Sequence, residues 1–158
     1  MSERLGGWVA LTARLLLGGV LLVAGVLKLP DPAEGVRAVR AFRLLPEPVV
    51  PAVGYGLPVL EIALGVLLVL GTAVRLAAVL TAVLLAAFVV GILGAWLRGL
   101  AIDCGCFGGG GSVAANQTRY GTETARDLAL LTVALGLARW PSSRLALSPA
   151  PSCMEGRP

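Results

Sequence analysis

The sequence predicts an all-α integral membrane protein: a four-helix transmembrane bundle with a short interfacial amphipathic helix between the first two spans. Of its 158 residues 57% are hydrophobic and only 14% are charged, and the mean hydropathy is +0.87. So few charges cannot cover the surface of a soluble domain. The apolar residues also gather into runs of about 18 residues or more, the length that crosses the hydrocarbon of a bilayer.

The first two predicted spans each carry an ionisable residue. The first covers about residues 8–29 and ends near Lys28. It is longer than the apolar part of a signal peptide, about 7–15 residues, so we expect it to stay in the protein. The second covers about residues 51–71, with Glu61 near its middle. A charge at mid-membrane costs about 2.5–3.5 kcal/mol or more, so Glu61 should face the bundle interior and have a partner, for which Lys28 and Arg126 are candidates.

The last two predicted spans differ in strength. The third, about residues 75–97, is free of charge after its first residue. The uncharged part of the fourth is too short to cross a bilayer alone. This span, about residues 122–140, must therefore take Arg126 and Asp127 into its first turns.

Short links between the spans predict one domain, residues 1–140. Only residues 71–75 separate the second and third spans, which predicts an antiparallel helical hairpin. Residues 141–158 are rich in proline and small polar residues, so we expect a disordered tail, which contains Cys153.

An apolar stripe and a basic stripe run side by side between the first two spans. The apolar stripe is Val36, Val39 and Phe42, and the basic stripe is Arg37, Arg40 and Arg43. A short helix with two such faces lies in the headgroup plane of a membrane. The alternative is a solvated charged loop. The thirteen basic residues are spread over every loop, so a calculated pI of 9.5 indicates phospholipid headgroups rather than nucleic acid as the counter-ions.

The chemistry of the chain is narrowed by the complete absence of histidine. Histidine is the usual general base and a usual ligand of zinc and haem. What remains is a glycine-rich segment after the third span that contains Cys104 and Cys106, separated by Gly105. We expect no metal site here, because a monomer offers zinc only two sulfurs plus carboxylates, although a homodimer could assemble four sulfurs.

Two cysteines one residue apart form a disulfide only in a small, strained ring, which Gly105 makes accessible. A strained and exposed disulfide exchanges readily with other thiols. Asp103 would raise the pKa of the neighbouring thiol by charge repulsion, and Arg98 or Arg126 would lower it. The alternatives are a fixed structural disulfide and two inert thiols.

Four motifs, in this order, resemble the MauE branch of the DoxX-like membrane proteins over roughly residues 8–140. They are Gly25-Val26-Leu27-Lys28-Leu29-Pro30-Asp31-Pro32, Pro58-Val59-Leu60-Glu61 with Gly65, Asp103-Cys104-Gly105-Cys106-Phe107-Gly108, and Arg126-Asp127-Leu128. The Cys-Gly-Cys-Phe-Gly piece, which includes Phe107, is the most specific of them.

The resemblance implies a four-helix protein of the bacterial inner membrane that is associated with redox chemistry. The MauE branch is linked to maturation of methylamine dehydrogenase, whose small subunit is rich in disulfides. A distant similarity to vitamin K epoxide reductase, which uses a Cys-x-x-Cys pair and a quinone, makes a quinone the candidate cofactor. The basic residues divide six to seven between the two sides and so do not orient the chain. The resemblance places both termini in the cytoplasm and the cysteine loop outside.

Our leading hypothesis is thiol–disulfide exchange between the Cys104–Cys106 pair and a partner protein, which would make the chain an oxidoreductase. Glu61, with Lys28 or Arg126, would polarise the interior or bind a small redox carrier. A second hypothesis is a transporter or an accessory subunit of a membrane complex, in which Glu61 binds an ion or proton and the cysteines are structural. A third is an assembly scaffold, and each admits a homo- or hetero-oligomer.

Overall fold

The computed structural model describes residues 2–114 and 118–140, with side chains from residue 7 onward. The predicted disordered tail and Cys153 lie outside the described residues. The helices are α1 (Ser2–Leu27), α2 (Pro32–Ala41), α3 (Val50–Leu70), α4 (Val74–Leu97) and α5 (Tyr120–Arg139), and the strands are β1 (Ile102–Asp103) and β2 (Gly111–Ser112). The predicted all-α class is confirmed, since each of the two strands is only two residues long.

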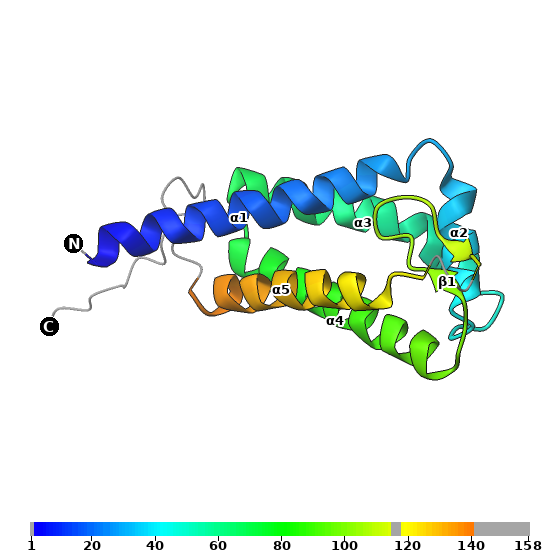
Figure 1. Ribbon diagram of the computed structural model, residues 1–158. Helices are drawn as coiled ribbons and strands as arrows, with labels where there is room; N and C mark the ends of the chain where they lie inside the picture. The colour runs from blue at the N-terminus through cyan, green and yellow to red at the C-terminus, as the bar shows by residue number, and fades with distance from the viewer. Residues whose placement is uncertain (1, 115–117, 141–158) are drawn as a thin grey trace, which may run out of the picture.

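The four long helices form a bundle in which α1 packs against α3 and α4 packs against α5 (Figure 1). Helix α2 and the two short strands cover one end of this bundle, which we call the cysteine end. The α3–α4 turn lies at the other end, the hairpin end, together with the start of α1 and the last turn of α5. An even number of long helices therefore brings the start and the finish of the bundle to the same end.

Within the described parts of the chain, three helices have the length and apolarity to cross a membrane: Gly7–Leu27 of α1, and the whole of α3 and of α4. Their outward faces are apolar as well, with Val83 and Val90 of α4 exposed by 63% and 68%. At about 1.5 Å per residue the 20 residues of α5 are also long enough, but its first turns are polar. The predicted four-helix bundle is confirmed, and a membrane crossing by α5 stays a prediction.

Helices α1 and α3 approach so closely that glycine is required on both. A Cβ atom on Gly18 would lie 3.0 Å from the carbonyl oxygen of Gly65, and one on Gly65 would lie 2.9 Å from that of Gly18. Two turns further on, a Cβ on Gly25 would meet the carbonyl oxygen of Pro58 at 2.9 Å. Small residues allow such close backbone contact between helices in a bilayer.

Helix α2 is amphipathic, as predicted. Val36 and Ala38 are buried, and Val36 sits so close to Gly54 of α3 that a Cβ on this glycine would lie 2.6 Å from the Val36 Cα. The opposite face is exposed and carries the basic stripe, where Arg37 bonds Asp31 at 2.7 Å and Arg40 pairs with Glu47 of the following loop. The apolar face of α2 thus packs against other parts of the protein, namely α3 and the cysteine loop.

Candidate functional site

The two cysteines lie in the loop of a small β-hairpin that sequence analysis did not predict. Strands β1 and β2 are antiparallel, with Ile102 opposite Ser112 and Asp103 opposite Gly111. Tyr120 of α5 anchors the base of the β-hairpin. Its hydroxyl accepts a hydrogen bond from the Ile102 amide and donates one to the Leu100 carbonyl. The loop between the strands, residues 104–110, is therefore tied to α5 at its base.

Glycine is what lets this loop fold beneath α2. Gly105 and Gly110 have φ angles of +67° and +106°, which side-chain-bearing residues rarely adopt. A Cβ on Gly105 would lie 3.0 Å from the Cβ of Ala38, and one on Gly110 would lie 2.7 Å from it. The cysteine loop is therefore packed against the underside of α2.

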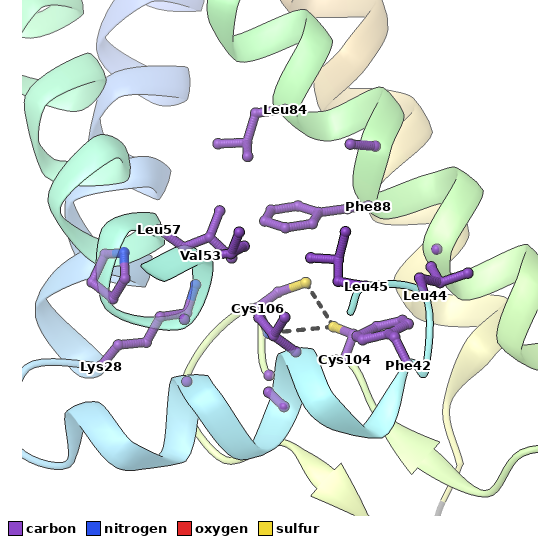
Figure 2. A pocket seen from close by; sticks show the side chains of 18 residues that line it. Lys28, Phe42, Leu44, Leu45, Val53, Leu57, Leu84, Phe88, Cys104 and Cys106 are labelled. Atoms are coloured by element: carbon purple, nitrogen blue, oxygen red, sulfur yellow. Dashed lines mark hydrogen bonds between the residues drawn. The ribbon is translucent and has the colours of Figure 1, made fainter. Parts of the chain in front are cut away.

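The two sulfurs lie side by side, as dashed lines in Figure 2 mark. Cys104 Sγ and Cys106 Sγ are 2.6 Å apart, and the Cys106 amide donates a hydrogen bond to Cys104 Sγ at 3.3 Å. A disulfide bond is about 2.05 Å long, so only a small movement separates this dithiol from the bonded pair. Cys104 is half-buried and Cys106 is 7% exposed, so Cys104 is the more accessible sulfur.

The surroundings shift the pKa values of the two thiols in opposite directions. The hydrogen bond from the Cys106 thiol lowers the pKa of Cys104, and the Cys106 amide and Arg126 act in the same direction against the effect of burial. The same sulfur–sulfur hydrogen bond, together with burial, raises the pKa of Cys106. The thiolate is the nucleophile in disulfide exchange, and of the two thiols Cys104 is the one whose surroundings favour the thiolate form.

Arg126 is the cation of this site, one of the two arginines that the sequence offered. Its Nη2 lies 4.0 Å from Cys104 Sγ, its Nε bonds Asp127 at 2.9 Å, and its guanidinium lies 4.7 Å from the centre of the Phe107 ring. Arg98 was the wrong candidate. It instead donates hydrogen bonds to the carbonyl oxygens of Gly94 and Phe42, at the junction of α4 with the end of α2.

Two carboxylates flank Cys104, and only one of them was expected. Asp103 accepts a hydrogen bond from the Gly105 amide at 2.8 Å and so shapes the turn between the cysteines. Glu123 of α5, 8% exposed, is the carboxylate whose charge raises the pKa of Cys104. Ligand atoms of Asp103, Cys104 and Glu123 all lie within 4.8 Å of one another, so these three could hold a metal ion, although a structural zinc site usually has four ligands.

Lys28 proves to be the partner of Glu61. Its ammonium bonds both carboxylate oxygens, at 2.6 and 2.7 Å, and the two residues are only 7% and 1% exposed. Pro58 and Gly65, which flank Glu61 on α3, meet the backbone of α1. The buried pair therefore lies inside the α1–α3 contact, between the end of one span and the middle of the next.

Two cavities connect the sulfurs with these buried charges. The larger, about 240 Å³, is lined by α2, α3, α4 and the cysteine loop, with Cys104, Cys106 and Lys28 in its wall (Figure 2). The smaller, about 20 Å³, is lined by Cys106, Glu61 and Asp127, among others. A cavity of about 10–15 Å³ holds one water molecule, so the smaller one has room for a water between the Cys106 thiol and two carboxyl groups.

Sequence analysis missed Glu123 as a site residue, and it placed Asp127, which is 2% exposed, only in the first turns of the fourth span and in the Arg126-Asp127-Leu128 motif. Both are buried on α5 beside Arg126. Their positions three and four residues apart place all three on one side of a helix, and this spacing was the available signal.

The family model of methylamine utilisation protein MauE matches residues 6–140. The methylamine utilization protein MauE of Paracoccus denitrificans is 36% identical over 126 residues, which are 79% of this chain and 66% of that relative's length. No solved structure matches. With its four-helix bundle and its Cys-Gly-Cys loop, the chain belongs to the MauE family.

Proposed function

We propose that this protein is a membrane thiol–disulfide oxidoreductase that supports disulfide formation in a partner protein. The observation that carries the proposal is the 2.6 Å separation of Cys104 and Cys106 Sγ, combined with the unequal surroundings of the two sulfurs. Inert structural thiols need neither a nearby guanidinium nor a hydrogen bond from one sulfur to the other. Both features favour a reactive thiolate at Cys104.

The exchange proceeds in two steps from the oxidised pair. A thiolate of the partner attacks Cys104 Sγ, the more accessible sulfur, and the Cys104–Cys106 bond breaks. Cys106 leaves with the electron pair and takes up a proton, and a mixed disulfide joins Cys104 to the partner. A second thiol of the partner then loses its proton and attacks the partner's sulfur in the mixed disulfide. The partner is now oxidised, and Cys104 leaves as a thiolate, the form that its lowered pKa favours.

A role in methylamine utilisation forms part of the proposal, because the matched family and the Paracoccus relative carry that name. The partner would then be a disulfide-rich protein of the methylamine dehydrogenase type. We place the cysteine loop on the outer side of the cell membrane and both termini in the cytoplasm, since disulfides persist outside the cytoplasm. Labelling of Cys104 in intact cells by a membrane-impermeant thiol reagent supports this orientation, and labelling only after lysis contradicts it.

The test uses purified protein in detergent and reduced ribonuclease as the partner. All variants carry Cys153→Ser, so that only the loop cysteines react. The oxidised pair should transfer its disulfide to ribonuclease. Cys106→Ser, treated to form a mixed disulfide with ribonuclease, should accumulate that species, because the resolving thiol is missing. Cys104→Ser should form far less of it, since the remaining sulfur is buried. Equal trapping by the two variants would contradict the assigned roles, and no transfer from the intact pair would contradict the function.

The transporter hypothesis makes the opposite prediction for cells. Lys28 occupies both oxygens of Glu61, so a transported cation would have to displace an ammonium ion. If a Cys104→Ser/Cys106→Ser variant keeps full activity in cells while Glu61→Gln loses it, the ion-site hypothesis replaces the redox one.

A further inference from the structure

The ligand atoms around Cys104 come from three separate elements. Asp103 ends β1, Cys104 begins the loop, and Glu123 lies in the first turn of α5. One atom of each lies within 4.8 Å of the other two. Tyr120, one turn before Glu123, bonds the base of the hairpin and so keeps β1 against α5. The fold therefore holds these atoms together, although the chain separates Glu123 from the other two residues.

Glu123 brings to this group an oxygen atom whose bonding capacity is unused. The residue is only 8% exposed, and its Oε2 finds no hydrogen-bond donor among the residues that the structure describes. A buried polar atom without a partner is costly, so such an atom normally has a water or an ion beside it. Asp103 holds the Gly105 amide with Oδ1, so its Oδ2 is the oxygen that can serve an ion.

Cys106 supplies a fourth ligand. Its sulfur lies 2.6 Å from Cys104 Sγ. Two sulfurs that bind one tetrahedral zinc ion, with bonds of about 2.3 Å, are about 3.8 Å apart, so this pair has to open by about 1 Å. Rotation of one cysteine side chain covers that distance. Two sulfurs and two carboxylates then make the four ligands that a zinc site usually has.

We propose that the reduced cysteine loop binds one divalent cation of the zinc type, and that the bound ion keeps the two sulfurs from forming their disulfide. The ligands are Asp103, Cys104, Cys106 and Glu123. Thiolate sulfur selects zinc-type cations over magnesium and calcium, which prefer oxygen ligands alone. Each thiol that still carries a proton releases it on binding. The blocking effect rests on the proposed function and adds a regulator to it. Sequence analysis expected no metal site because it did not place Glu123 beside the sulfurs.

Arg126 belongs to the charge balance of this site. Two thiolates and two carboxylates carry two negative charges more than a divalent cation compensates. The Arg126 guanidinium, 4.0 Å from Cys104 Sγ, balances one of them. Its bond to Asp127 fixes the guanidinium in this position. A group that contacts a metal ligand from outside commonly orients that ligand and tunes the site in this way.

Binding is tested on the full chain with Cys153→Ser, reduced and freed of metal with EDTA, in detergent without oxygen. The probe is Co²⁺, because charge transfer from sulfur to cobalt colours a thiolate-bound ion, and added Zn²⁺ should displace it. We expect one ion per chain. Glu123→Gln and Asp103→Asn should each weaken binding about tenfold or more, equivalent to about 1.4 kcal/mol. Asp103→Asn keeps an oxygen for the Gly105 amide, and thermal unfolding in EDTA checks that both variants are folded. Glu47→Gln, which changes an exposed carboxylate, is the matched control and should bind as the parent does.

The blocking effect is measured with diamide, an oxidant that brings no thiol of its own. Zn²⁺ at about ten times its Kd should slow formation of the Cys104–Cys106 disulfide about tenfold, because only the ion-free fraction reacts. EDTA should restore the rate. At the same Zn²⁺ concentration Glu123→Gln should be slowed only about twofold, since its Kd is about tenfold higher.

Three results would overturn the metal site. One is the absence of sulfur-to-cobalt charge transfer in the parent protein. Another is equal affinity of the parent, Glu123→Gln and Asp103→Asn, which would mean that sulfur alone binds the ion. The third is one ion per two chains, which would mean a four-sulfur site between copies. Oxidation that bound Zn²⁺ does not slow would overturn the blocking effect. Disulfide exchange with ribonuclease is measured without metal, so its absence would remove the proposed function and leave the metal site standing.

Discussion

The two ends of this bundle are held together by different physics. At the hairpin end, helices meet through apolar side chains such as Leu17, Leu68 and Ala77, each fully buried, with Arg14 as a charged residue among them. At the cysteine end, Lys28 just after α1, Glu61 of α3 and Asp127 of α5 are buried and line the same two cavities as the sulfurs. Among the described residues, the hairpin end thus holds a single buried arginine in an apolar core, whereas the cysteine end gathers several buried charges around the two sulfurs. Variants at the two ends should therefore fail in different ways.

The largest effect is expected from Lys28→Met, which leaves the Glu61 carboxylate buried without its cation. Removing one partner of a buried ion pair costs about 3–5 kcal/mol. Removing both, in Lys28→Met/Glu61→Leu, should restore most of this stability, because no uncompensated charge remains. Thermal unfolding in detergent measures both variants. If the double variant is as unstable as the single one, the pair does more than balance charge.

Leu68→Ala tests the comparison at the hairpin end of the bundle. Leu68 is 0% exposed, and loss of a buried leucine costs about 2–5 kcal/mol. Disulfide exchange per folded molecule should nevertheless equal that of the wild type, since Leu68 lies in the last turn of α3, at the hairpin end. Unfolding and exchange are measured on the same preparation. A lower exchange rate in the folded fraction would mean that the two ends are not separable.

Cys106→Ala sharpens the assignment of roles within the cysteine end. The hydrogen bond from the Cys106 thiol is the main cause that lowers the pKa of Cys104. Its removal should raise that pKa, so at any pH below it a smaller fraction of Cys104 is thiolate. The rate of alkylation by iodoacetamide should fall at neutral pH, and its midpoint should move to higher pH. An unchanged midpoint would assign the shift to Arg126 or to the Cys106 amide instead.

The smallest effect is expected from Glu123→Gln. The charge of Glu123 raises the pKa of Cys104, so its removal should lower that pKa and move the alkylation midpoint to lower pH. The opposite sign from Cys106→Ala makes the two variants mutual controls. Glu47→Gln changes an exposed carboxylate on the α2–α3 loop and should leave the midpoint in place. A shift of equal size in Glu47→Gln would point to a general surface-charge effect.

Sequence reasoning was strongest for the helices, because an apolar run of sufficient length has one stable solution in a bilayer. It also identified the cysteine loop, the amphipathic α2 and the need of Glu61 for a partner. Whether Lys28 or Arg126 would pair with Glu61 depended on how α1 crosses α3. Two glycines that are far apart in the chain decide this crossing by their close contact. In the sequence, Arg98 and Arg126 were equal candidates for the cation near Cys104. Only the packing of α5 beside the β1–β2 hairpin distinguishes them.

The cysteine loop is tightly packed where it passes under α2. Ala38 rests on Gly105 and Gly110 with no room for even one added carbon atom. The other side of the same helix presents Arg37 and Arg40 to the surroundings. Only the width of this short helix therefore separates the two surface arginines from the glycines beside the sulfurs. A partner protein that approached Cys104 from the side of α2 would first have to displace this helix.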